Sequence, residues 1–91
     1  MKEESKELEE KAKLQQQVIM LENIAKQHLS KEAIERYGRM KLAHTATAIQ
    51  AIAIIAQAAQ MGQLNETLND NEFKELLKKI QEGKQEFKFK K

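Results

Sequence analysis

The sequence of 91 residues contains no cysteine, no proline and no tryptophan, and it has only three glycines. Without cysteine the chain has no disulfide, no thiolate metal ligand and no cysteine nucleophile. Without proline, and with so few glycines, almost nothing in the chain interrupts a helix. The lack of cysteine fits a reducing compartment, and the first 13 residues lack the apolar stretch of a signal peptide. We therefore expect a cytoplasmic protein.

Lysine, glutamate, glutamine, alanine, leucine and isoleucine dominate what remains, and this composition is typical of helices. The length allows one domain. We predict an all-α fold, a compact three-helix bundle with an additional N-terminal helix and a short, extended, basic C-terminal tail. The expected boundaries are a charged helical extension over residues 1–13, frayed or solvated, a helical bundle over 14–83 and the basic tail over 84–91.

Formal charge is absent between Leu42 and Asn65, which raises the question of a membrane span. A span needs about 20 predominantly apolar residues, and three glutamines interrupt residues 46–61. On a helical wheel the glutamines fall on one narrow side, while isoleucine and alanine fill most of the rest. The pattern indicates a central core helix over residues 46–61, which begins at a threonine cap (Thr45 or Thr47) and ends at Gly62.

Helix signals also flank this segment. Ser30 is a suitable N-cap for a helix that follows it, and Asn69 with Glu72 forms a pair that resembles a capping box. The helix after Asn69 has an apolar face at spacings of three and four residues, made of Phe73, Leu76, Leu77 and Ile80.

A second apolar stripe lies nearer the N-terminus. It steps by three or four residues and consists of Leu14, Val18, Leu21, Ala25 and Leu29. We expect this stripe to dock on the other helices.

Residues suited to catalysis or metal binding are few. His28 and His44 are the only histidines. Two histidines without cysteine make a weak metal site, and the chain has no glycine-rich phosphate loop. We predict a protein that is not an enzyme and that uses neither a metal nor another cofactor.

Positive charge is gathered in two places although the net charge is only +2. Arg36, Arg39 and Lys41 form the first cluster, in a stretch without acids. The second cluster is in the tail and consists of Lys84, Lys88, Lys90 and Lys91. Such cations can neutralise backbone phosphates of a nucleic acid. The alternative is that they stabilise a helix C-terminus through its macrodipole and keep the tail soluble.

Phe87 and Phe89 alternate with lysines in the same tail. They can stack on bases of a single strand, or they can pin the tail to the bundle. The residues alone leave both interpretations open.

Four segments together resemble a known family: "LSKEAIERYGRMKLAH", a helix end "AAQMGQL", then "LNDNEFKELLKKI" and a basic "EFKFKK". In their order and spacing they are similar to the programmed cell death protein five family, and most of all to its short archaeal members. The resemblance covers about residues 14–91. It implies a compact three-helix bundle with a mobile N-terminal helix, and binding of double-stranded DNA with little sequence preference and without catalysis.

By position, the resemblance assigns the family's basic segment to Arg36, Arg39 and Lys41, and its basic end to Lys88, Lys90 and Lys91. The chain departs from the family pattern at His44, Thr45 and Ala46, where members usually carry a basic residue, a proline and an acid. The acidic tail of the eukaryotic members is also missing.

We therefore expect a monomeric, non-enzymatic protein that contacts duplex DNA through phosphates. The alternative is a helical adaptor whose N-terminal helix binds a chaperone or another protein complex. An anionic membrane surface is a weaker candidate, because the cations do not interleave with large apolar residues along one helix.

Overall fold

The computed structural model describes residues 2–83, with side chains from residue 6 onward. Over this range the chain is all-helical and contains no strand, which confirms the predicted fold class. The helices are α1 (Lys2–Lys26), α2 (Lys31–Ala43), α3 (Thr45–Gln60) and α4 (Asp70–Gln81). The predicted tail, with Phe87 and Phe89, lies outside the described residues.

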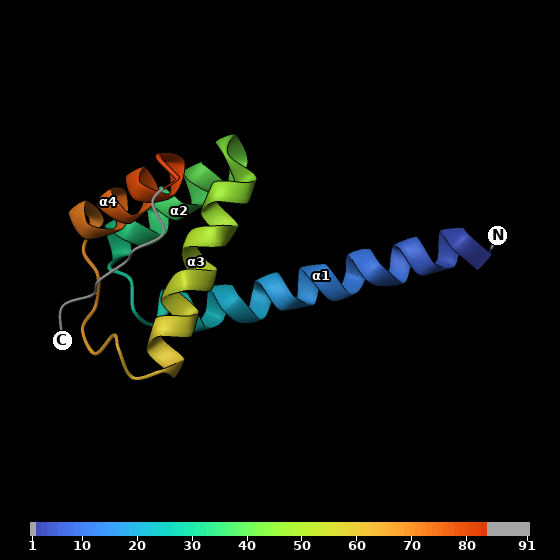
Figure 1. Ribbon diagram of the computed structural model, residues 1–91, viewed down its shortest axis with the longest axis horizontal. Coiled ribbons are helices and arrows are strands. Elements are labelled where there is room, and N and C mark those ends of the chain that lie inside the picture. The colour runs from blue at the N-terminus through green and yellow to red at the C-terminus, as the bar shows by residue number, and fades with distance from the viewer. Residues whose placement is uncertain (1, 84–91) are drawn as a thin grey trace.

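Helix α3 is the centre of the fold, as its lack of charge predicts, and it contacts α1, α2 and α4 (Figure 1). Six of its residues are buried: Ala48, Ala51, Ile52, Ile55, Ala56 and Ala58. The glutamines Gln50, Gln57 and Gln60 are exposed, as the helical wheel predicts. None of the helices, over the part of the chain that the structure describes, has the length and hydropathy of a membrane span.

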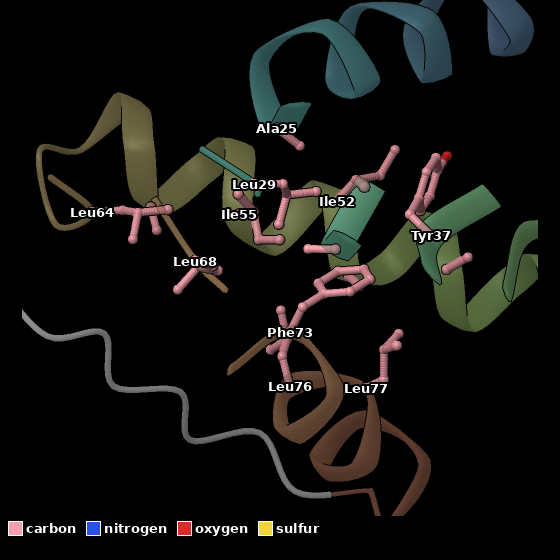
Figure 2. Close-up of a cluster of buried hydrophobic side chains, with 14 residues drawn as sticks. Ala25, Leu29, Tyr37, Ile52, Ile55, Leu64, Leu68, Phe73, Leu76 and Leu77 are labelled. Carbon is pink, nitrogen blue, oxygen red and sulfur yellow. The ribbon is translucent and has the colours of Figure 1, made fainter. Parts of the chain in front are cut away.

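The core is filled from all four helices and from the loop between α3 and α4. Phe73 of α4 and Ile52 and Ile55 of α3 are the largest side chains that are completely buried, and they belong to one cluster (Figure 2). Leu64 and Leu68 add side chains from the loop to the same cluster. Apart from the hydroxyl of Tyr37, the buried side chains of the described chain carry no polar group, so the core is held together by apolar packing.

Helix α1 is a single helix of 25 residues that projects from the body of the molecule (Figure 1). Its C-terminal part packs on the core through Val18, Leu21 and Ala25, as the apolar stripe predicts. Leu14, the first member of that stripe, is 59% exposed, because the helix has already left the body at this point. The helix continues without a break across residue 13, and the predicted border between extension and bundle stays a prediction.

Two of the predicted helix starts are confirmed. The Ser30 side chain accepts a hydrogen bond of 3.1 Å from the amide of Ala33 and caps α2. Asn69 and Glu72 form a reciprocal capping box at the start of α4. Such caps satisfy amides that have no partner within the helix.

The predicted threonine cap of α3 is wrong. The N-cap residue is His44, and its side chain makes no capping hydrogen bond. Only this one residue separates α2 from α3, so Thr45 is already the first helical residue and Thr47 lies inside the helix. The Thr45 hydroxyl instead donates a hydrogen bond of 2.6 Å back to the carbonyl of Lys41 in the last turn of α2.

Two backbone hydrogen bonds join segments that are far apart in the sequence. The amide of Ser30 donates to the carbonyl of Leu68, and the amide of Leu68 donates to the carbonyl of His28, each over 2.8 Å. This isolated bridge ties the turn between α1 and α2 to the segment that leads into α4. It fixes where α4 begins relative to α2.

Gly38 in the middle of α2 is the site of a first testable prediction. A Cβ atom added there meets nothing within 4 Å, and the residue is exposed. Because glycine is disfavoured inside a helix, we expect Gly38→Ala to raise the free energy of unfolding by about 0.5–1 kcal/mol. Urea denaturation of the two proteins measures this difference, and an unchanged or lower stability would contradict the expectation.

Candidate nucleic-acid interface

A groove with a volume of about 630 Å³ runs between α2 and α4 on the surface of the molecule. Its walls come from both helices and carry three cations, one carboxylate, two amides and two apolar side chains. The lining residues are Arg36, Met40, Asn71, Lys74, Glu75, Leu77, Lys78 and Gln81. Two of these residues also belong to the interior, since Leu77 is part of the core cluster and Met40 packs against it.

Arg36 is held in place by an acid from the other helix. Its Nε donates to Asp70 Oδ1 over 2.6 Å and its Nη2 donates to Asp70 Oδ2 over 2.9 Å. Both side chains are about 30% exposed. These hydrogen bonds lower the pKa of Asp70 and raise that of Arg36. The pair joins α2 to α4 and partly neutralises the charge that the sequence assigns to Arg36.

Arg39 and Lys74 lie near this pair and form no ion pair with any described residue. After the hydrogen bonds from Arg36, the charges of these two residues also lower the pKa of Asp70, which places them in its neighbourhood. Both are exposed, and so is Lys78, one turn after Lys74 on α4. We call Arg36, Arg39, Lys74 and Lys78 the α2–α4 basic surface.

Lys41 does not belong to this surface, although the sequence groups it with Arg36 and Arg39. Its Nζ donates to Glu22 Oε2 of α1 over 2.7 Å, and the hydroxyl of Tyr37 donates to the same oxygen over 2.6 Å. Five residues along a helix correspond to a rotation of about 140°, so Lys41 faces α1 while Arg36 faces α4. Lys41 therefore serves to dock α1.

The structure thus divides the predicted site residues into three groups. Arg36 and Arg39 lie on the α2–α4 basic surface, and Lys41 lies against α1. Four lysines, Lys84, Lys88, Lys90 and Lys91, lie outside the described residues.

The α2–α4 basic surface also contains two cations that the sequence interpretation missed. Neither Lys74 nor Lys78 is among the site residues expected from the sequence, which uses only the apolar face of this helix. The signal that was available is their spacing of four residues, which places both lysines on one side of α4.

The two histidines lie in different turns of the fold. Among the residues with described side chains, no group of three histidine or acidic side chains could hold a metal ion. His44 is exposed at the junction of α2 and α3, and His28 is half-buried in the turn after α1.

Comparison with known proteins places the chain in a family. The sequence profile described as "double-stranded DNA-binding domain" matches residues 1–91. A DNA-binding protein of Pyrococcus horikoshii is 33% identical over 90 residues, which cover 96% of this chain and 78% of that protein. A DNA-binding protein of Pyrococcus furiosus is also 33% identical over 90 residues, covering 96% of this chain and 80% of the relative.

A shorter match is found in Thermococcus sibiricus, whose DNA-binding protein is 40% identical over 60 residues, or 66% of this chain and 54% of that protein. No solved structure has a significant match to the chain. The resemblance to archaeal members of the programmed cell death protein five family is confirmed by these matches. The chain belongs to the family of double-stranded DNA-binding domains.

Proposed function

We propose that the protein binds double-stranded DNA through backbone phosphates, with little preference for sequence and without catalysis. The observation that carries this proposal is the α2–α4 basic surface, where Arg39, Lys74 and Lys78 are exposed and make no ion pair with any described residue. Such cations can bind phosphate without first giving up an internal partner. The family of the chain and the names of its relatives support DNA as the ligand.

Phosphate contacts, rather than base contacts, fit the composition of the surface. Lysine is a compact point charge that suits phosphate, whereas reading of base edges relies on the paired donors of arginine or on the donor and acceptor of an asparagine amide. Arg36 already uses its Nε and Nη2 donors on Asp70. Asn71 and Gln81 line the groove, but they are separated along α4 by almost three turns.

The salt dependence of binding tests the proposal. We expect the wild-type protein to bind a random-sequence duplex with an affinity that falls steeply with salt. If about four to six phosphates are contacted, the log–log slope is near −4 to −5. In the double variant Lys74→Ala/Lys78→Ala, the slope should become shallower by about 1.8, because each lost phosphate contact removes about 0.9. Fluorescence anisotropy of a labelled duplex at several salt concentrations gives both slopes.

Lys11→Ala/Lys13→Ala is the matched control. It removes the same charge from exposed positions of α1, away from the α2–α4 basic surface, and we expect it to keep the wild-type slope. An equal reduction of the salt slope in both double variants would mean that net charge alone is the cause. No binding of the wild type even at low salt would remove DNA as the ligand. Arg36 and Lys41 are left intact here, because each forms an ion pair with a residue of another helix.

A further inference from the structure

The junction of α2 and α3 exposes a large apolar side chain that the fold does not use. Leu42 is 89% exposed, the highest value among the large apolar residues of the described chain. Its neighbours Ala43, His44, Thr45 and Ala46 are exposed as well. We call residues 42–46 the α2–α3 corner. It lies at the end of α3 opposite to the loop that leads into α4 (Figure 1).

Hydrogen bonds fix the backbone of this corner. The amide of His44 donates to the carbonyl of Met40, and the Thr45 hydroxyl donates to the carbonyl of Lys41, each over 2.6 Å. The amide of Ala48 donates to the carbonyl of His44 over 3.0 Å. Because both helix ends are bonded across a single linking residue, Leu42 is held on a rigid projection.

Leu42 has an arginine as its neighbour on α2. Arg39 lies one turn before it on α2, and the two residues share one side of the helix. The chain contains no aspartate or glutamate between Arg36 and Asn65. The nearest carboxylate on this side of α2 is Glu35, two turns from Leu42, or about 10 Å along the helix axis.

We propose that Leu42 is a wedge that inserts between neighbouring base pairs from the minor groove, while Arg39 contacts phosphate beside it. This inference rests on the proposed binding of duplex DNA and adds a residue that acts on the bases. Minor-groove binding proteins insert leucine and other apolar side chains between base steps, and the partial unstacking kinks the duplex. An exposed, rigidly held leucine that adjoins a phosphate-binding cation meets the requirements for this contact.

A protein partner fits the α2–α3 corner less well. A stable protein interface buries about 800 Å² on each partner, around a core of several apolar side chains. The corner offers one leucine, surrounded by alanine, threonine and histidine. A gap between base pairs, in contrast, accepts a single side chain.

The wedge has two physical consequences. The bound duplex is bent, on the order of 20–90° for known wedges, and the bend is favoured at flexible pyrimidine–purine steps. The contribution of Leu42 to affinity is independent of salt, because the side chain displaces no counterion.

Energy transfer between dyes at the two ends of a short duplex tests the bend directly. The duplex contains a central TpA step. We expect the wild-type protein to shorten the distance between the dyes and Leu42→Ala to leave it near that of free DNA. Met61→Ala is the matched control, since Met61 is 61% exposed near the other end of α3, and it should bend the duplex like the wild type. Leu42→Phe, which keeps a wedge, should retain the bend.

Anisotropy at several salt concentrations provides the second measurement. We expect Leu42→Ala to weaken binding by about tenfold at every salt concentration, since the gain from burying leucine is partly offset by unstacking. Its salt slope should equal that of the wild type. A wild-type protein that binds without bending, or a Leu42→Ala protein that bends equally well, would overturn the wedge and leave the proposed function intact. Absence of any duplex binding would overturn both.

Discussion

Phe73→Ala is expected to lower the free energy of unfolding by about 3–5 kcal/mol, the largest effect of any substitution considered. Phe73 is completely buried, and its ring points from the first turn of α4 toward the isoleucines of α3 (Figure 2). The substitution removes the side chain that attaches α4 to the centre of the fold and leaves a cavity. Proteins of this size have a total stability of about 5–15 kcal/mol, so the variant keeps only a fraction of it.

Urea denaturation followed by circular dichroism measures this loss. Phe73→Leu serves as the control, because it keeps an apolar side chain in the same position and should cost much less than the alanine substitution. A loss below about 1 kcal/mol for Phe73→Ala would mean that the core closes over the cavity, contrary to the close packing of protein interiors.

Glu22→Ala is expected to produce the second-largest effect, a loss of about 1–3 kcal/mol. Glu22 accepts hydrogen bonds from Tyr37 and Lys41 of α2, and its own side chain is only 12% exposed. Tyr37 is 2% exposed, so removal of the carboxylate leaves a buried hydroxyl without its acceptor. Thermal and urea unfolding measure the change. Glu22→Gln keeps an acceptor for Tyr37, so it should lose less, and an alanine variant as stable as wild type would show that α1 is docked by apolar contacts alone.

The same carboxylate makes the docking of α1 sensitive to acid. Burial raises the pKa of Glu22, but the hydrogen bonds from Lys41 and Tyr37 and the charges of Lys41 and Lys26 outweigh it and lower the pKa below its ordinary value of 4.5. A lowered pKa in the folded state means that the charged form contributes stability above pH 4.5, and that this contribution is lost as the pH falls through the folded-state value.

The pH dependence is measured as the difference in the free energy of unfolding between the wild type and Glu22→Gln. The contributions of the other carboxylates are nearly the same in both proteins and largely cancel in this difference. We expect the wild type to exceed Glu22→Gln in stability near pH 7. The difference should shrink progressively below about pH 4.5 as the carboxylate becomes protonated. A difference that stays constant down to pH 3 would assign the stabilisation to the shape of the side chain instead of its charge.

The helices could be predicted from the sequence because their signals are local. Ser30 and the Asn69–Glu72 pair stand within three residues of the amides that they satisfy, so spacing alone is sufficient. Helix α3 was recognisable because a run without charge that is too polar for a membrane has to be buried. The prediction of a threonine cap failed because the single linking residue, His44, takes the N-cap position and Thr45 is already helical.

The candidate site depends on contacts that no local pattern contains. Arg36 and Asp70 are 34 residues apart, and Glu22 and Lys41 are 19 apart. Their pairing follows from how α2 sits between α1 and α4, which composition and periodicity do not specify. For the same reason the sequence grouped Lys41 with Arg36, although the helix turns them toward different neighbours, and it left out Lys74 and Lys78, which only the packing of α4 brings beside Arg36.

Because α1 projects from the body, its amide protons are expected to exchange with solvent through two different opening reactions. Amide protons between residues 10 and 17 are hydrogen-bonded in a helix whose side chains are all exposed, so they exchange with solvent when the end of that helix opens. Amide protons between residues 21 and 26 exchange only when α1 leaves α3, because Leu21 and Ala25 are packed in the core. Deuterium uptake along this single helix therefore reports the free energy of local opening at the first set of residues. About two turns later it reports the free energy of separating α1 from α3.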